Sequence, residues 1–263
     1  MKNIKVYNTE QLDNVRQSGK ILSHTLVLLQ ESLRSGISTL ELDRIAEDYI
    51  RSSGAEPSFQ NYNGYKYSIC TSINEESIHG MPRKDKILKD GDIISIDVGV
   101  RFNGMCTDAA RTFAIGEISD EAKHLIQITE QSFFEAIRGL KAMSKVGDIG
   151  ERIENYIRVN STYSIVDRYF GHGVGEKVHE DPLIPNFIPP KKSIPKLKEI
   201  VRTRLPLHSV IAIEPMINMG VKDLKTASDK WTAITVDGKL AAHYENTLII
   251  LENGVEVVTL TNN

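Results

Sequence analysis

The sequence predicts an α+β protein in which helices back antiparallel strands. Three observations support this class. Two pairs of segments have the apolar spacing of amphipathic helices, and strands that carry acidic residues follow each pair. One strand segment contains Asn103-Gly104, a dipeptide preferred in two-residue hairpin turns, so its neighbouring strands run antiparallel. The order long helix, glycine, shorter helix, histidine-bearing loop and acid-bearing strands occurs twice, which predicts two similar halves.

The first half, about residues 1–115, begins with two predicted helices. Apolar residues at helical spacing predict a long amphipathic helix over 9–35, which a glycine then ends. Ser38 with Glu41 forms a capping box at the start of a second helix, which ends near Gly54. Loop and strand segments then lead to the hairpin.

The second half, about residues 116–263, repeats this order. A helix begins at Ser119 with acidic residues in its first turn, and a shorter helix follows Gly147. Strands are predicted within 209–218 and 231–254. The pattern E-x-Y-I-R of the second helix recurs 107 positions later, which supports duplication within a single catalytic domain.

Composition restricts the class of protein. A chain of 263 residues with a net charge of −3 can bury a large core, and it has no basic excess that would favour DNA. Only Cys70 and Cys106 are present, too few for a disulfide framework, which indicates a reducing cytoplasm. The N-terminus lacks the apolar run of a signal peptide, and no stretch reaches membrane-span length. We therefore expect a cytoplasmic protein without a DNA or membrane partner.

The predicted hairpin carries two aspartates on one face. A two-residue turn pairs Gly99 with Asp108 and Asp97 with Ala110. The two acids then lie diagonally across the strands, roughly 7–8 Å apart at the backbone, which lets them share one ion. Two solvated acids on an exposed face are the alternative. Partners from the rest of the chain decide between these interpretations.

The second half supplies four candidate partners. A buried, unpaired Glu214 at the end of an apolar strand would cost several kcal/mol, so a metal is a suitable partner. His172 and His179 are seven positions apart, which places them on opposite faces of a continuous strand unless a loop re-aims one. Glu245 shares a strand face with His243, so a solvated face is the alternative for this acid.

The hairpin acids together with His172, Glu214 and Glu245 make four carboxylates and one imidazole. Four neighbouring acids repel one another by several kcal/mol unless cations lie between them. Two divalent ions remove this repulsion, and an oxygen-rich set with one nitrogen suits Mn, Fe, Co or Zn. Two such ions, a few ångström apart, can hold a bridging hydroxide as nucleophile. These residues therefore predict a dinuclear metal hydrolase.

Five blocks carry a resemblance to a known family: "SINEESIHGMP", "DVGVRFNGMCTDAARTF", "GHGVGEKVHEDP", "IEPM" and "HYENT". In order and spacing they resemble the type I methionine aminopeptidases over nearly the whole chain. The resemblance implies the duplicated pita-bread fold, with a curved antiparallel sheet, and removal of the initiator methionine before a small second residue. It implies that Asp97 chelates one metal, that Asp108 and Glu245 bridge both, and that His172 and Glu214 bind the other.

The resemblance also implies catalytic roles. His79 would hydrogen-bond the scissile amide nitrogen, His179 would polarise the carbonyl oxygen, and Glu214 would be the general base toward the bridging water. Aromatic and sulfur surfaces suit a thioether, although plain core packing is the alternative for clustered aromatics. The implied substrate-binding residues are Tyr62, Tyr65, Cys70, His79, His179 and Trp231.

Two features depart from the family. Val178 stands where many bacterial relatives carry a bulky aromatic residue, which predicts a wider pocket. Residues 183–208 are longer than the family's usual connection and are predicted to form a surface insertion. The register at Trp231 stays open, because a two-residue turn at 237–238 places it opposite the Glu245 face, whereas a three-residue loop pairs the two directly.

Two rival functions follow from the same residues. A prolidase or Xaa-Pro aminopeptidase uses similar ligands, but such enzymes usually carry an extra N-terminal domain for which no residues remain. A non-catalytic binding protein of this fold has lost its ligands, whereas all five ligand positions are filled here. The expected partners are a peptide or nascent-chain N-terminus, two divalent metal ions (Co, Mn, Fe or Zn) and, transiently, the ribosome. The expected state is a monomer.

Overall fold

A pair of helices followed by antiparallel strands occurs twice along the chain, as predicted. The structure is a computed structural model, and it describes residues 4–190, 192 and 195–260. Its helices are α1 (Thr9–Ser32), α2 (Thr39–Ser52), the 3₁₀ helix η1 (Tyr62–Gly64), α3 (Asp120–Ile137), α4 (Val146–Asn160) and α5 (Pro195–Arg202). Its strands are β1 (Glu56–Pro57), β2 (Ile69–Ile73), β3 (Glu76–Ile78), β4 (Ile93–Phe102), β5 (Met105–Ala114), β6 (Ser164–Ile165), β7 (Gly171–Gly173), β8 (Glu180–Ile184), β9 (Val210–Ile213), β10 (Met216–Asn218), β11 (Leu224–Thr226), β12 (Ala233–Thr235), β13 (Ala241–His243), β14 (Asn246–Ile250) and β15 (Val255–Val257).

Side-chain caps begin helices α1 and α2 near the predicted positions. Asn8 caps α1 in a reciprocal capping box with Gln11. Ser38 caps α2 as predicted, because the Glu41 amide donates to its hydroxyl at 3.2 Å. The Glu41 carboxylate does not complete the predicted capping box by accepting from the Ser38 amide. It pairs instead with Arg34 at 3.3 Å. None of the helices within the described ranges has the length and apolar character needed to cross a membrane.

The β4–β5 hairpin has the predicted register. Asn103 and Gly104 have φ values of 46° and 83°, as a type I′ turn requires at its two central positions. Gly99 pairs with Asp108, and Asp97 pairs with Ala110. The dipeptide therefore determines which face of the hairpin carries the two acids.

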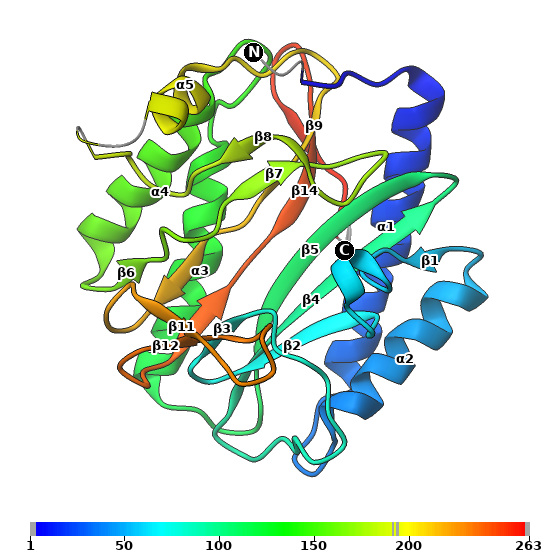
Figure 1. Ribbon diagram of the computed structural model, residues 1–263, viewed down its shortest axis with the longest axis vertical. Coiled ribbons are helices and arrows are strands. Elements are labelled where there is room, and N and C mark those ends of the chain that lie inside the picture. The colour runs from blue at the N-terminus through cyan, green and yellow to red at the C-terminus, as the bar shows by residue number, and fades with distance from the viewer. Residues whose placement is uncertain (1–3, 191, 193–194, 261–263) are drawn as a thin grey trace.

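Strand β5 joins the first half of the chain to the second (Figure 1). Ala110 and Glu245 exchange two backbone hydrogen bonds, of 3.3 and 3.0 Å. Thr247 adds a second link, because its hydroxyl accepts from the Asp108 amide at 2.9 Å and donates to the Asp108 carbonyl at 2.8 Å. These bonds hold the hairpin acids beside the acid-bearing strands of the second half.

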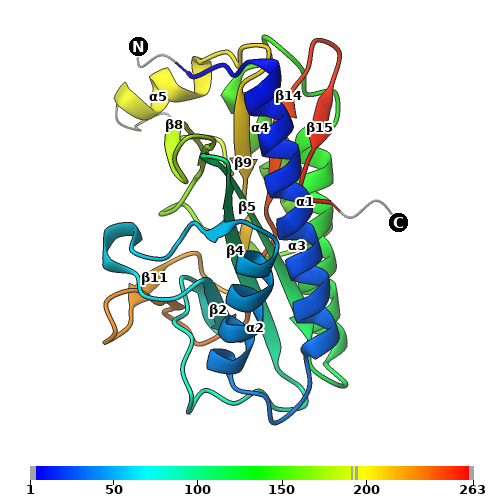
Figure 2. The same cartoon turned by 90° about the vertical axis from the view of Figure 1, so that its right-hand side faces the viewer.

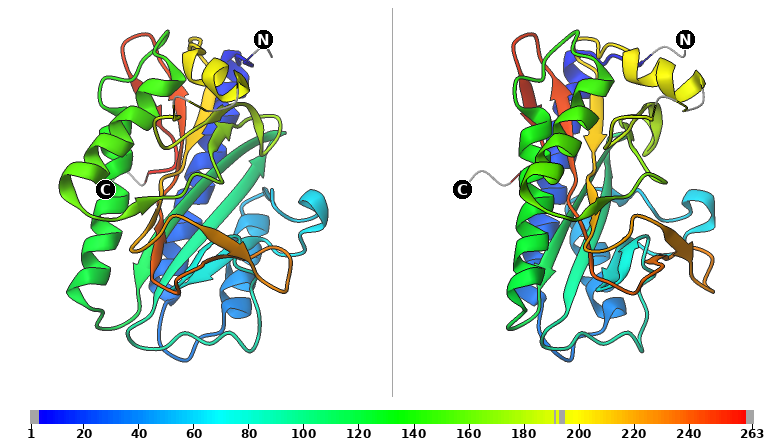
Figure 3. Two further views of the ribbon diagram at one scale, coloured as in Figure 1. Left: turned by 60° about the vertical axis from the view of Figure 1, so that its left-hand side comes forward. Right: turned by 90° about the vertical axis from the view of Figure 1, so that its left-hand side faces the viewer.

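Helices α1, α3 and α4 cover one face of the strands, and η1 and the loop around β11 lie toward the other (Figure 2). Figure 3 shows the same layering from the opposite side. One apolar core joins α1 and α2 to β2 and β4, and another joins α3 and α4 to β9, β10, β13 and β14. The apolar residues of β4 face the helices, so the alternating face with Asp97 and Asp108 lies on the side of the sheet away from them.

The predicted insertion at 183–208 begins inside the sheet, because β8 extends to Ile184. Helix α5 lies within this range, and none of its residues is buried. It lies against α4, where a Cβ on Gly147 would come within 2.8 Å of the Val201 carbonyl oxygen. Residues 191, 193 and 194 of the predicted range lie outside the described residues.

Candidate active site

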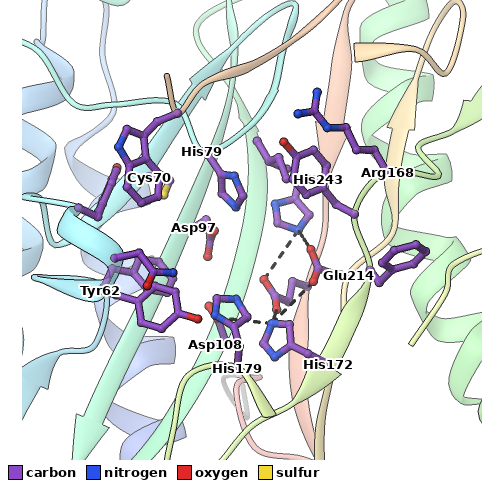
Figure 4. Close-up of a pocket in the computed structure, with 18 of the residues that line it drawn as sticks. Tyr62, Cys70, His79, Asp97, Asp108, Arg168, His172, His179, Glu214 and His243 are labelled. Carbon is purple, nitrogen blue, oxygen red and sulfur yellow. Dashed lines mark ion pairs between the residues drawn. The ribbon is translucent and has the colours of Figure 1, made fainter. Parts of the chain in front are cut away.

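A pocket of about 360 Å³ collects residues from both halves of the chain (Figure 4). Acidic and imidazole side chains form one part of its lining, which we call the floor. Aromatic and sulfur side chains form another part, which we call the wall. The floor consists of Asp97, Asp108, His172, Glu214, His243 and Glu245, and the wall consists of Tyr62, Tyr65, Cys70 and Trp231.

The hairpin brings Asp97 and Asp108 to the same face, as the register predicted, and both line the pocket. Asp108 is buried, whereas Asp97 is half-buried with its Oδ1 enclosed. Gly99 lies across from Asp108, and a Cβ there would come within 2.4 Å of the Phe59 ring. A glycine is therefore needed for Phe59 to line the pocket beside the acids.

His172 faces three carboxylates. Its Nδ1 donates to the Gly173 carbonyl at 3.0 Å, since a carbonyl can only accept, and this leaves the Nε2 lone pair free. Nε2 lies 3.9 Å from Asp108 Oδ2, 3.7 Å from Glu214 Oε1 and 3.9 Å from Glu245 Oε1. These separations exceed a hydrogen bond but suit donors that each bind a shared cation at about 2.0–2.2 Å.

His243 belongs to the floor, although the sequence analysis did not select it as a ligand. Its Nε2 lies 3.7 Å from both Glu214 Oε2 and Glu245 Oε2. The strand face that His243 was expected to share with Glu245 was a signal in the sequence, but it did not distinguish a solvated face from a pocket lining. The floor therefore contains a second imidazole beside the four carboxylates and the one imidazole that the sequence predicted as ligands.

Burial perturbs every ionisable group of the floor. It raises the pKa of Asp97 to about 7 and raises the pKa values of Asp108, Glu214 and Glu245 well above their usual range. Burial also lowers the pKa values of both floor imidazoles to about 3. Four enclosed atoms have no hydrogen-bond partner: Asp97 Oδ1, Asp108 Oδ1, Glu245 Oε1 and His243 Nε2.

This donor set fits divalent cations. Three sets of donor atoms lie within 4.8 Å of one another: Asp108 with His172 and His179, Asp97 with His243 and Glu245, and His172 with Glu214 and Glu245. Cations would satisfy the partnerless oxygens and favour the charged carboxylates. His179, which the resemblance places outside the ligand set, also lies within reach of Asp108 and His172.

The wall residues that the resemblance implied do meet in one pocket. The Tyr65 ring lies 5.0 Å from the Trp231 ring in an edge arrangement, and the Tyr65 hydroxyl donates to the Ile69 carbonyl at 2.9 Å. Cys70 pairs with Asp97 across β2 and β4, so the wall adjoins the floor. Additional lining residues that the sequence analysis did not identify are Phe59, Asn63, Ile78, Arg168, Tyr169, Phe170, Leu183 and the floor residue His243.

Neither register considered for Trp231 was right, whereas the effect expected of Val178 stays a prediction. Strand β12 pairs with β11 and β3 rather than β13, so neither hairpin register considered for Trp231 applies, and it lines the same pocket as Glu245. Val178 is 2% exposed and packs in the apolar cluster that also holds Tyr65 and Cys70, but it does not itself line the cavity, so a wider pocket stays a prediction.

The two remaining histidines approach the floor from different loops. His79 has a φ of 58°, a strained conformation for a residue with a side chain, and its ring lies 5.3 Å from that of Tyr169. Burial lowers its pKa to about 4. The His179 ring lies 4.3 Å from that of His172, because the chain turns between β7 and β8 and brings both rings to one side.

Buried carboxylates and imidazoles around one cavity, on antiparallel sheets backed by helices, define a metal-dependent hydrolase. Metallopeptidase family M24 matches residues 13–252. The chain therefore belongs to metallopeptidase family M24 and, within it, to the methionine aminopeptidases, as the resemblance predicted. The predicted pita-bread fold is confirmed with the family.

The relatives match along nearly their whole length. The chain is 50% identical to a methionine aminopeptidase of Clostridium perfringens over 253 residues, covering 96% of this chain and 97% of the relative. It is 45% identical to methionine aminopeptidase 1 of Bacillus subtilis over 249 residues, covering 95% and 96%. The crystal structure of methionine aminopeptidase from Thermotoga maritima superposes with a TM-score of 0.91 at 33% identity, covering 98% of this chain and all of the other.

Proposed function

We propose that this chain removes the initiator methionine from nascent proteins whose second residue is small. The observation that carries this proposal is one cavity in which a floor of carboxylates and imidazoles adjoins an aromatic and sulfur wall. The relatives at 45–50% identity are methionine aminopeptidases, which supports the same reaction here. A floor alone would suit many metallohydrolases, so the wall gives the proposal its specificity.

The floor would hold two divalent ions drawn from Co, Mn, Fe and Zn. Asp97 would bind one ion, Asp108 and Glu245 would contact both, and His172 and Glu214 would bind the other. Bound ions would lower the pKa of water toward about 7 and so supply hydroxide at neutral pH. Hydrogen bonds to the Glu245 backbone support its role. Ala110 exchanges backbone hydrogen bonds with Glu245, and the Arg111 guanidinium donates to the Glu245 carbonyl at 2.6 Å.

Three side chains would move or direct protons during hydrolysis. Glu214 would accept the proton of the attacking water, and its carbonyl is anchored by the Asn186 amide at 2.9 Å. His79 would donate a hydrogen bond to the scissile amide nitrogen, and its lowered pKa of about 4 keeps the ring neutral at pH 7. His179 would polarise the substrate carbonyl oxygen.

The wall would bind the methionine side chain. A thioether makes favourable contacts with aromatic rings and with the Cys70 sulfur surface, and Tyr65 and Cys70 are buried against this space. The cavity of about 360 Å³ lies within the size range of small-molecule pockets, so it has room for a methionine side chain.

The cellular setting is part of the same proposal. Cys70 and Cys106 are both free thiols, which suits a reducing cytoplasm. A nascent-chain substrate implies action near the ribosome, with a transient contact, and the resemblance implies a monomer.

Methionine release from short peptides tests the proposal. Metal-free protein is loaded in turn with Mn, Fe, Co, Ni or Zn and mixed with Met-Ala-Ser, Met-Gly-Met, the matched control Leu-Ala-Ser, or Xaa-Pro peptides. We expect free methionine from the first two peptides and little leucine from the control. Intact methionine peptides with every metal, together with cleaved Xaa-Pro peptides, would favour the prolidase function.

A further inference from the structure

Two glutamates of the floor lie between two imidazoles. Glu214 turns Oε1 toward His172 and Oε2 toward His243, at 3.7 Å in each case. Glu245 does the same, with Oε1 at 3.9 Å from His172 and Oε2 at 3.7 Å from His243. The floor therefore has two ends, and each end carries one imidazole.

The His243 end has the properties of a cation position. His243 Nε2 is enclosed and has no hydrogen-bond partner, and its 3.7 Å separations are too long for hydrogen bonds. Two donors that bind one cation at about 2.0–2.2 Å lie within about 4.4 Å of each other. Donor atoms of Asp97, His243 and Glu245 all lie within 4.8 Å of one another, so small side-chain shifts would bring them within this limit.

The backbone holds His243 in this orientation. Its amide donates to the Thr112 hydroxyl at 3.0 Å, and that hydroxyl donates back to the His243 carbonyl at 2.9 Å. Met216 pairs with His243 across β10 and β13, so the imidazole projects from a strand rather than from a loop. A rigid support of this kind is what a ligand to a fixed cation requires.

We propose that His243 is a metal ligand, whose Nε2 joins Asp97 and Glu245 at a second cation position opposite His172. This inference rests on the proposed function insofar as that function places two divalent ions in the floor. An imidazole at both ends would shift the preference of the second position away from Mg toward Fe, Co and Zn, because nitrogen donors suit those ions.

Cobalt binding by a His243→Gln variant tests the inference without an activity assay. Metal-free wild type and variant are titrated with Co²⁺ in a calorimeter, after circular dichroism has shown that the variant is folded. We expect one binding event to keep its affinity and the other to weaken at least about 10-fold. His79→Gln is the matched control, because it removes a buried pocket imidazole that belongs to none of the three donor sets, and it should titrate like wild type.

X-ray absorption at the cobalt edge gives a second measurement. Imidazole scattering per cobalt should fall in His243→Gln and stay unchanged in His79→Gln, and His243→Asn serves if the first variant does not fold. Unchanged cobalt affinity and imidazole scattering would overturn the inference, even if the variant lost turnover through a substrate contact.

The two proposals can fail separately. Wild type that binds two cobalt ions, one through His243, but releases no methionine would contradict only the proposed function. Wild type that releases methionine while His243→Gln binds cobalt normally would contradict only the inference.

Discussion

The floor and the wall of the pocket are built on different kinds of backbone. Four floor residues lie on or directly beside the paired strands β4, β5, β7 and β13, and the two glutamates lie at strand ends. In the wall, only Cys70 lies on a strand, β2, whereas Tyr62 lies on a 3₁₀ turn, Tyr65 directly follows it, and Trp231 lies in a loop before β12. The charged groups of the floor must be held in fixed positions to bind cations, whereas the wall would bind the methionine side chain of the substrate through shape and apolar contact. We therefore expect floor variants to lose metal and wall variants to keep it.

Removal of a floor acid gives the largest expected effect. Asp108→Ala and Asp97→Ala should lose bound metal together with activity, by a factor of about 10³ or more in kcat/KM, because the remaining acids no longer balance two cations. Metal content by plasma mass spectrometry and methionine release are measured on the same samples. The control is Asp85→Ala, which removes an exposed acid that pairs only with Arg83 in the described structure. Full metal content in Asp108→Ala would contradict the claim that the floor acids hold the metal and the wall does not.

The floor was largely predictable from the sequence, for a physical reason. The turn dipeptide determines the hairpin register, and four converging acids cannot be buried in their charged form without cations. His243 was missed because Glu245 lies between β13 and β14, so strand alternation alone did not show that both side chains enter the pocket.

The wall was predicted only through the family resemblance. Its residues meet through pairings of distant segments, such as β12 with β3, that no local pattern specifies. The same long-range pairing made both proposed registers for Trp231 wrong. The division into two duplicated halves stays a prediction.

The second prediction separates histidines that bind metal from those that contact substrate. His79→Ala and His179→Ala should keep their metal and lose kcat by roughly 10²–10³, because each would donate a hydrogen bond that strengthens in the transition state. Steady-state kinetics and metal analysis together check this. Loss of metal in His179→Ala would instead place that residue in the floor, with Asp108 and His172.

The third prediction concerns pH and the floor alone. Burial raises the pKa of Asp97 to about 7, so the metal-free site holds protons at neutral pH that a cation must displace. Cobalt affinity should therefore rise with pH between 6 and 8, by up to about tenfold per pH unit for each proton released. Calorimetry in buffers of different ionisation enthalpy measures the released protons. Affinity that is independent of pH would show that the floor acids are already ionised without metal.

The smallest expected effect belongs to the wall. Trp231→Ala should raise KM for Met-Ala-Ser about 5-fold with little change in kcat, because it removes binding shared by substrate and transition state. Metal content should equal that of wild type. Loss of metal from this variant would mean that floor and wall are not separate parts of the site.

Anomalous diffraction at the cobalt edge tests the central claim most directly, namely that the floor is a two-cation centre. Crystals of wild type grown with Co²⁺ should show two peaks inside the pocket, one beside His172 and one between Asp97 and His243. His79 and Trp231 should lie outside the coordination distance of both. A pocket with no anomalous peak, or peaks only on the protein surface, would contradict the account.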